Sequence, residues 1–252
     1  MNPSEPPIDV TRAALFLDLD GTLAAIVAKP SDVGPEPART NVVERALQAL
    51  DGRLAVISGR RIADIDHILE GRVAAVAGIH GLERRSADGV VERALAPAGL
   101  ASARAAVAEM AAGRGLIAED KELSVTLHFR SAPELEAEAL AFLHALADTH
   151  NLTLQRGDMV GELRAPGRNK GDAISAFMKE QPFTGATPIF IGDDLTDEDG
   201  FKAAHSLGGI GILVGPPRTT AARWRLDDPR AVLNWIDSGV ARGTFEPESQ
   251  HA

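Results

Sequence analysis

Three short apolar runs of this chain, 13–18, 54–57 and 187–191, each end in small polar or acidic residues. The runs lack the alternation of apolar and polar residues that a half-exposed strand shows, which is typical of strands in a sheet covered by helices on both faces. Parallel sheets of this kind hold their ligand sites at the carboxyl ends of the strands. The polar residues after each run are therefore candidates for a shared site.

The spacing of apolar residues predicts an α/β order at both ends of the chain. Before about Gly81 it predicts strands at 13–18, 54–57 and 73–77, with helices near 40–50 and 62–69. After about Arg168 it predicts a helix from Gly171, a strand at 187–191, a helix after Asp197, a strand at 210–214 and a last helix around 231–236.

The first of these runs ends in Asp18-Leu19-Asp20-Gly21-Thr22. Residues i and i+2 of a strand point to the same side, so Asp18 and Asp20 face one small volume, where their repulsion requires a cation or a shared proton. Mg²⁺ suits a few carboxylates combined with phosphate and water. A surface turn and a calcium loop are the alternatives, although the following residues lack the ligand run and the Glu of a calcium loop.

Three further segments add polar groups to the predicted helix starts. Ser58 precedes a helix and can either bind an anion or simply cap that helix. Asp193 begins a cluster of five acids in seven positions, which can simply complement the helix dipole, although so many acids repel one another unless a cation lies nearby. Lys170 opens another helix, where it can equally be an ordinary solvated charge.

The order Asp-X-Asp-Gly-Thr, Ser, Lys and Gly-Asp-Asp-X-X-Asp resembles the haloacid dehalogenase superfamily of phosphotransferases over residues 14 to about 215. This resemblance implies a Rossmann-like core in which Asp18 attacks phosphorus and Asp20 acts as general acid and base. It further implies that Thr22 and Ser58 hold phosphoryl oxygens and that Lys170 neutralises charge. Mg²⁺ is implied on Asp18, the backbone carbonyl of Asp20 and Asp193, with Asp194 and Asp197 as auxiliary metal groups.

The middle of the chain, 83–167, has a different pattern. Ser124, Thr126, His128 and Arg130 alternate with apolar residues, which predicts a one-sided strand. Helical patterns at 98–112 and 133–149 can cover its apolar face, and a hairpin at 152–164 places Val160, Glu162 and Arg164 on one side. We therefore expect an α+β cap at 83–167, inserted into a core formed by 1–82 and 168–252. Its polar face suits sugar hydroxyls, or it is a plain solvated surface.

Four segments are similar to the trehalose-6-phosphate phosphatase family. These are Glu119-Asp120-Lys121 with Ser124, His128 and Arg130; Gly157 to Arg164; Ala77 to Glu83; and Gly192 to Glu198. The likeness implies substrate binding by Glu119, Lys121, His128, Arg130 and Glu162 of the cap and by Gly59, Arg60 and His80 of the core. Ala165-Pro166 departs from the family, which more often has Pro directly after the basic residue.

The resemblance implies Mg²⁺-dependent hydrolysis of trehalose 6-phosphate through an aspartyl-phosphate. One alternative is a phosphatase for another phosphosugar, such as sucrose phosphate or mannosyl phosphoglycerate. Another is a receiver-like phosphoacceptor module. The Asp-X-Asp spacing and the long cap oppose the receiver.

Composition narrows the remaining options. Cysteine is absent, which excludes disulfides and thiolate chemistry, and no apolar run approaches the roughly 20 residues that span a bilayer. The formal net charge of −10 argues against a nucleic-acid partner. Residues 1–12 are too polar for a signal peptide. We expect a cytoplasmic, monomeric enzyme with a small-molecule substrate, no membrane partner, and disordered ends at 1–12 and 241–252.

Overall fold

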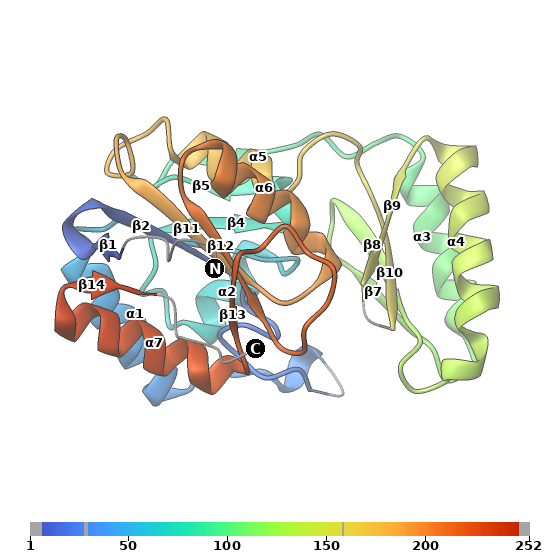
Figure 1. The fold of residues 1–252 in the computed structure, drawn as a ribbon. Helices are drawn as coiled ribbons and strands as arrows, with labels where there is room; N and C mark the ends of the chain where they lie inside the picture. Colours follow the sequence, from blue (N-terminus) through green and yellow to red (C-terminus); the bar gives the residue numbers. More distant parts are fainter. Residues whose placement is uncertain (1–6, 28–29, 158, 247–252) are drawn as a thin grey trace. The chain divides into compact units, whose positions relative to one another are not determined.

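The computed structural model describes residues 7–27, 30–157 and 159–246, which divide into two compact units (Figure 1). The first unit, called the core, has its described residues within Met1–Val91, Asn169–Asp193 and Asp197–Ala252. The second, called the cap, comprises Glu92–Arg168 and the short stretch Asp194–Thr196.

The core is built on an eight-stranded sheet with β2 near its middle. The strand order is β13 (Trp224–Leu226), β12 (Ile210–Val214), β11 (Thr187–Gly192), β2 (Ala13–Leu17), β3 (Leu54–Ile57), β4 (Ala75–Gly78), β5 (Glu83–Arg85) and β6 (Val91–Arg93). All neighbours from β13 to β4 are parallel, and β5 runs antiparallel to β4. The strand order reverses around β2, which places a ligand site at its carboxyl end.

Helices cover both faces of this sheet, as the lack of alternation predicts. Leu15 and Leu17 of β2 lie in a core cluster with residues of three helices: α1 (Pro37–Ala49), α2 (Ile62–Ile68) and α7 (Pro229–Arg242). Phe16 points to the opposite cluster, which contains residues of α5 (Lys170–Phe177) and α6 (Glu198–Ser206). The wholly apolar character of β2 therefore follows from burial on two sides.

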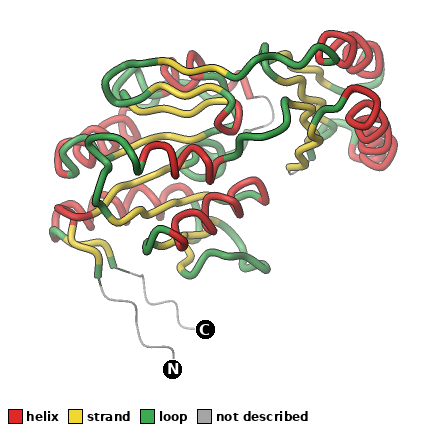
Figure 2. The backbone as a smooth tube through the Cα atoms, turned by 90° about the horizontal axis from the view of Figure 1, so that it is seen from above, coloured by secondary structure: helices red, strands yellow, loops and turns green. Residues whose placement is uncertain are grey.

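The cap is an antiparallel sheet with its helices on one face (Figure 2). The strand order is β7 (Ile117–Asp120), β8 (Ser124–His128), β10 (Val160–Arg164) and β9 (Thr153–Gly157). The helices α3 (Leu100–Ala111) and α4 (Glu136–His150) pack on the side of Val125, Leu127 and Leu163. The predicted hairpin at 152–164 is confirmed as β9 and β10, although Asp158 of its turn lies outside the described residues.

Two expectations about segment ends differ from the structure. β5 and β6 extend the core sheet beyond residue 82 because a hairpin continues antiparallel from β4. Near the termini, β1 (Ile8–Asp9) pairs with β14 (Thr244–Phe245), so the expected disorder is wrong for the described residues there. Phe245 stacks on Trp235 with ring centroids 4.8 Å apart, which anchors the second of these strands. Residues 1–6 and 247–252, also expected to be disordered, lie outside the described residues.

Short 3-10 turns complete the described elements. They lie at Val10–Arg12, Pro30–Asp32, Ile79–Gly81, Pro133–Leu135 and Leu195–Asp197.

Candidate active site

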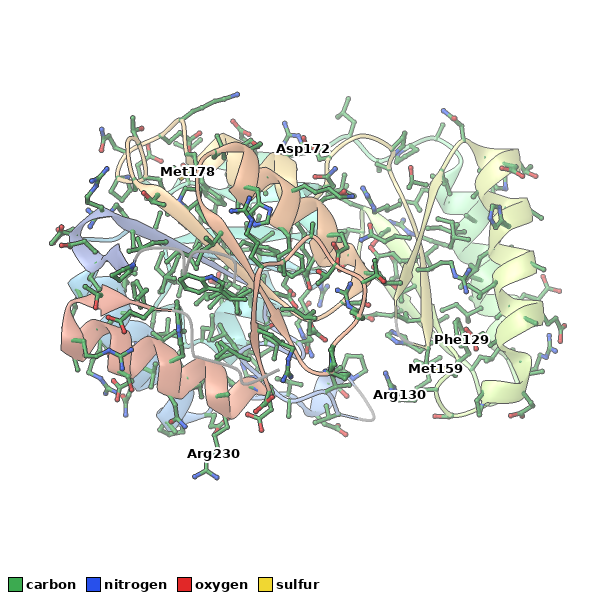
Figure 3. All side chains as sticks on the ribbon, in the orientation of Figure 1. Phe129, Arg130, Met159, Asp172, Met178 and Arg230 are labelled. Carbon is green, nitrogen blue, oxygen red and sulfur yellow. The ribbon has the colours of Figure 1, made fainter. Side chains whose placement is uncertain are left out.

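Lys170 joins two distant carboxylates at the carboxyl edge of the core sheet. Its ammonium donates to Asp18 Oδ1 at 2.9 Å and to Asp197 Oδ1 at 2.6 Å, and all three side chains are buried. Asp18 directly follows β2, while Lys170 is the first residue of α5. Asn169 and Asp172 form a reciprocal capping box that fixes this helix start (Asp172 is labelled in Figure 3). Lys170 is therefore not the solvated charge that the sequence left open.

Three acids gather beside this lysine. Carboxylate oxygens of Asp18, Asp193 and Asp197 all lie within 4.8 Å of one another. Asp197 Oδ2 also accepts from the backbone N–H of Asp193 at 2.9 Å, which holds the loop after β11 in place. Gly21, with φ of +81°, approaches so closely that a Cβ there would lie 2.1 Å from Asp193 Oδ2. Such a set of hard oxygen donors fits a divalent cation such as Mg²⁺.

The crowding of the acids perturbs both partners of the central ion pair. Burial raises the pKa of Asp18 well above its ordinary value; Asp197 and Asp193 add to the rise, while Lys170 opposes it. Burial acts to lower the pKa of Lys170, but the carboxylates of Asp18 and Asp197 outweigh it, and that pKa lies above its usual range. Lys170 therefore stays charged, and its single positive charge does not balance the three acids of the cluster.

Two hydroxyl groups lie in the loops that follow β2 and β3. Thr22 is fully buried, and its Oγ1 has no hydrogen-bond partner among the described residues. Ser58 is also buried, and its Oγ accepts the backbone N–H of Arg60 at 3.2 Å. Because that oxygen accepts a hydrogen bond, its own proton can be directed to another acceptor. A buried hydroxyl without a partner is costly unless a ligand completes it.

Asp20 points to a different partner from Asp18. Its carboxylate accepts two hydrogen bonds from Arg60, each at 2.7 Å, and Arg60 also donates to the carbonyl of Pro30 at 2.9 Å. The predicted site residues Asp20 and Arg60 are thus brought together. The Asp20 side chain does not join the acid cluster formed by described residues, and neither does Asp194, whose Oδ1 accepts from the N–H of Leu195.

The cap gathers four of its predicted residues on the polar face of its sheet. Lys121 donates to Glu162 Oε2 at 3.1 Å, and His128 Nε2 lies 2.8 Å from Glu119 Oε2. Thr126, which is in register with both Glu119 and Glu162, donates to Glu162 at 3.2 Å. The alternation of the sequence placed Thr126 on this polar face, but Thr126 was not among the expected substrate-binding residues.

The charges of this cap cluster favour an ionised Glu119. Burial acts to raise the pKa of Glu119, but the hydrogen bond with His128 and the charge of Lys121 outweigh burial and bring that pKa below its ordinary value. Lys121 and Glu162 are buried, with exposed side-chain fractions of 9% and 6%. The face is therefore not the plain solvated surface that the sequence left open.

Other predicted residues lie elsewhere or act differently. β8 ends at His128, so Arg130 is an exposed residue of the following turn, beside Phe129 and Met159 (Figure 3). Its expected place in the polar row of the strand is wrong because the strand ends two residues earlier, at His128. His80 is buried and packs over Gly59.

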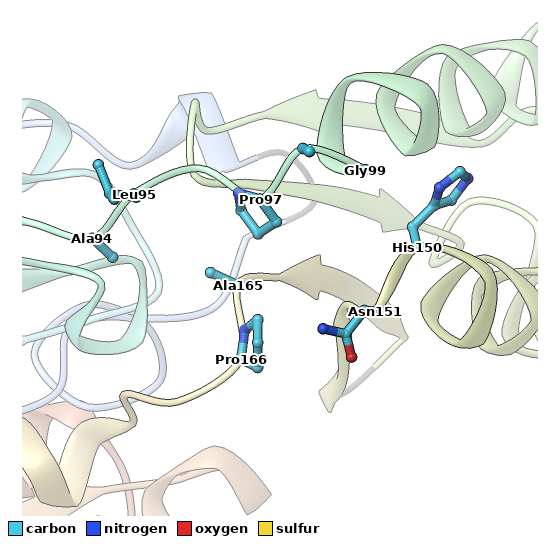
Figure 4. A pocket seen from close by; sticks show the side chains of 9 residues that line it. Ala94, Leu95, Pro97, Gly99, His150, Asn151, Ala165 and Pro166 are labelled. Atoms are coloured by element: carbon cyan, nitrogen blue, oxygen red, sulfur yellow. The ribbon is translucent and has the colours of Figure 1, made fainter.

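A cavity of about 500 Å³ lies in the cap and is mostly apolar (Figure 4). Its lining comes from the chain segments that enter and leave the cap and from the end of α4: Ala94, Leu95, Pro97, Ala98, Gly99, His150, Asn151, Ala165 and Pro166. None of the predicted site residues lines it. Within the described part of the chain, no helix has the length and hydropathy needed to cross a membrane.

Comparison with known proteins shows the family to which the sequence is similar. The family model described as trehalose-phosphatase matches residues 16–230. The chain is 35% identical over 237 residues to the trehalose-6-phosphate phosphatase of Escherichia coli (strain K12), covering 93% of this chain and 89% of that protein. It is 38% identical over 212 residues to a probable trehalose-phosphate phosphatase of Sinorhizobium fredii, covering 83% and 80%.

Solved structures support the fold. The C-terminal domain of a trehalose-6-phosphate phosphatase from C. albicans superposes with a TM-score of 0.81 at 21% identity over 92% of each chain. A trehalose-6-phosphate phosphatase related protein gives 0.74 at 23% identity, covering 91% of this chain and 98% of that one.

Proposed function

The chain belongs to the trehalose-phosphatase family, and on that premise we propose that it hydrolyses trehalose 6-phosphate to trehalose and inorganic phosphate. The observation that carries the proposal is the buried Asp18 carboxylate, held by Lys170 among Asp193 and Asp197. An acid placed in this way is oriented for attack but lacks charge compensation for an anionic substrate.

In the proposed reaction, Asp18 Oδ attacks phosphorus and forms an aspartyl-phosphate as the sugar oxygen leaves. Lys170 orients Asp18 and offsets negative charge that gathers on the phosphoryl oxygens. The hydroxyls of Thr22 and Ser58 supply donors to those oxygens, which completes the unpartnered Thr22 Oγ1.

Asp20 is the proposed general acid for the leaving sugar oxygen and the base that later activates water. Its bidentate pair with Arg60 holds the carboxylate in one orientation. A proton on Asp20 lies on one of the two oxygens that accept from Arg60, so protonation weakens that hydrogen bond. Arg60 is therefore proposed to position Asp20, in addition to its expected contact with substrate.

Mg²⁺ is the proposed cofactor. Asp18 and Asp193 would hold it, and Asp197, whose oxygens contact Lys170 and the Asp193 backbone, would fix their positions. When bound, the ion supplies positive charge that reduces repulsion between the substrate phosphate and the acids.

Glu119, Lys121, His128 and Glu162 are proposed to bind the sugar rings. A sugar hydroxyl both donates and accepts hydrogen bonds, and this cluster offers carboxylate acceptors beside an ammonium donor. A ligand without the matching hydroxyls would leave these buried groups unsatisfied, which supports specificity.

A panel of phosphorylated sugars, with and without Mg²⁺, tests the proposal through phosphate release. We expect trehalose 6-phosphate to have the highest kcat/KM and activity to require the divalent ion. Equal rates with glucose 6-phosphate or sucrose phosphate would refute the substrate assignment. A stable phosphoenzyme without multiple turnover would refute the assignment of phosphatase activity.

We further propose that the enzyme acts in the cytoplasm as a monomer without a nucleic-acid or membrane partner. The absence of cysteine and the net charge of −10 are consistent with this setting. Gel filtration of the full chain tests the oligomeric state.

A further inference from the structure

Three consecutive residues after β4 have a left-handed backbone. The φ angles are +48° at Ile79, +54° at His80 and +96° at Gly81. Glycine adopts such angles freely, but a β-branched residue such as Ile79 does so only when its surroundings impose the conformation. The contacts of this segment show which neighbour it is shaped to fit.

The neighbour is the loop that begins with Ser58. The N–H of Ser58 donates to the carbonyl of Ala77 at 2.9 Å, and the N–H of His80 donates to the carbonyl of Ser58 at 3.0 Å. The N–H of Ile79 donates to the carbonyl of Arg60 at 2.8 Å. The left-handed turn thus lets the chain after β4 bond to both Ser58 and Arg60 of this loop.

The His80 side chain packs against the same loop. A Cβ at Gly59 would lie 2.7 Å from His80 Nε2 and 2.8 Å from its Cε1, so the imidazole occupies the space that any side chain at position 59 would need. His80 is 8% exposed. Position 59 therefore has to be glycine while His80 is present. The imidazole fills the space beside Gly59 and limits movement of the loop.

Glu83 fixes the other end of the loop. Its buried carboxylate accepts the backbone N–H of Ile62, the first residue of α2, at 2.5 Å. Gly78 leaves room for this contact, because a Cβ there would lie 2.7 Å from Glu83 Oε1 and 2.8 Å from the carbonyl of Arg60. The loop from Ser58 to Ile62 is therefore held at both ends by the segment 77–83.

We propose that His80 and Glu83 are positioning residues that hold the Ser58 hydroxyl in place for the phosphate, so that His80 acts on the phosphate end of the substrate and not on its sugar. The inference rests on the proposed function, because it gives Ser58 the role of phosphate donor. It also changes the role expected for His80 from the sequence. Loss of either contact misplaces a group that must meet a phosphoryl oxygen within hydrogen-bonding distance.

The first test compares His80→Ala with wild type on trehalose 6-phosphate and on p-nitrophenyl phosphate, which has no sugar. Positioning predicts that kcat/KM falls by the same factor, roughly tenfold to a hundredfold, on both substrates. The competitive inhibition constant of inorganic phosphate should also rise, because the phosphate site is disturbed. This constant is a useful second measurement because it does not depend on how much of the protein is active. His80→Asn, which tolerates the left-handed backbone, should fold even if alanine does not.

Loss confined to trehalose 6-phosphate would overturn the inference and return His80 to the sugar. An unchanged phosphate inhibition constant in both variants would overturn it as well. If wild type hydrolyses only p-nitrophenyl phosphate, the proposed substrate fails while the comparison of His80 variants remains readable. If it hydrolyses neither, calorimetric titration of inorganic phosphate into the full chain still compares the variants.

The second test uses the contact with Gly59. Gly59→Ala should lower kcat/KM on both substrates because its methyl group meets the imidazole, and adding His80→Ala should recover part of that loss. Gly34→Ala is the control, since a Cβ there has open space around it, and it should leave activity unchanged. Additive losses in the double variant would show that the two residues act independently.

Glu83→Gln should retain more phosphate affinity than Glu83→Ala, because the amide oxygen can still accept from Ile62; equal losses would exclude Glu83 from the positioning role.

Discussion

Replacing Lys170 by methionine tests the charge balance of the core site. The side chain of Lys170 is 3% exposed and contacts two buried carboxylates. Methionine has a similar length but no charge, so the variant leaves Asp18, Asp193 and Asp197 together without their cation. Removing one partner of a buried ion pair destabilises a protein by about 3–5 kcal/mol, because the other charge stays buried and uncompensated.

The distances in the site give a similar magnitude. Carboxylate oxygens of the three acids lie within 4.8 Å of one another, and at that upper limit two unit charges repel each other by about 3.5 kcal/mol at an effective dielectric constant near 20. A loss of about 4 kcal/mol lowers the unfolding midpoint of a chain of this size by roughly 8–16 °C. Protonation of an acid can relieve part of this repulsion, so the loss should be larger at pH 8 than at pH 5.

The assay is denaturant and thermal unfolding of the Lys170→Met chain in the presence of a chelator. Lys179→Met, an exposed lysine two residues beyond the end of α5, is the control and should change stability by less than about 0.5 kcal/mol. Adding Asp18→Asn to Lys170→Met should recover stability, because it removes one of the crowded charges. A Lys170→Met chain within about 1 kcal/mol of wild type would refute the reasoning.

Three further predictions concern catalysis and the cap. Asp18→Asn should lower steady-state phosphate release by several orders of magnitude with an unchanged circular dichroism spectrum, and a variant retaining more than about 1% of turnover would exclude Asp18 as nucleophile. Glu162→Ala should raise KM for trehalose 6-phosphate roughly tenfold to a hundredfold while sparing p-nitrophenyl phosphate; equal losses would place Glu162 outside sugar binding. Because the pKa of Glu119 is lowered in the folded state, its contribution to stability is present above its ordinary pKa of 4.5 and is lost as pH falls through the folded value. Calorimetry should therefore find that wild type is more stable than Glu119→Gln by up to about 1 kcal/mol at pH 7. This difference in stability should shrink below pH 4.5. A difference that increases as the pH falls would contradict the proposed interactions of Glu119 with His128 and Lys121.

The elements that sequence patterns predict well are those whose burial is set by long apolar runs. The strand at 54–57 is confirmed to the residue, and the helices on both faces of the core follow from the absence of alternation. β7 was not predicted because Ile-Ala-Glu-Asp has neither an apolar run nor strict alternation. β1 and β14 depend on pairing between residues more than 230 positions apart, for which two-residue strands carry no local signal.

The candidate site, too, is only partly predictable from the sequence, for the same physical reason. The position of Asp18 and Asp20 just after β2 follows from local spacing, but their partners do not. The expectation that both carboxylates face one volume is wrong, because β2 ends at Leu17 and Asp20 meets Arg60. Lys170 lies 152 positions from Asp18, and Arg60 lies 40 positions from Asp20, so only the folded sheet decides which cation meets which acid. His80 shows the same limit, since a left-handed backbone turns its side chain onto Gly59, and periodicity contains no information about that angle.

The local charges explain why the core site needs additional positive charge before it can accept an anionic substrate. In the core site, three carboxylates meet one lysine, while the nearby guanidinium groups of Arg60 and Arg218 are paired with Asp20 and Glu198. A phosphate dianion that enters this site adds negative charge to an existing excess, so the two repel each other over a few ångströms. Asp18 and Asp193 would hold a divalent cation whose charge would offset that excess, and Lys170 could then meet the phosphoryl oxygens. The divalent ion should therefore bind before the substrate, and the apparent affinity for phosphate should rise with its concentration until the acids are saturated.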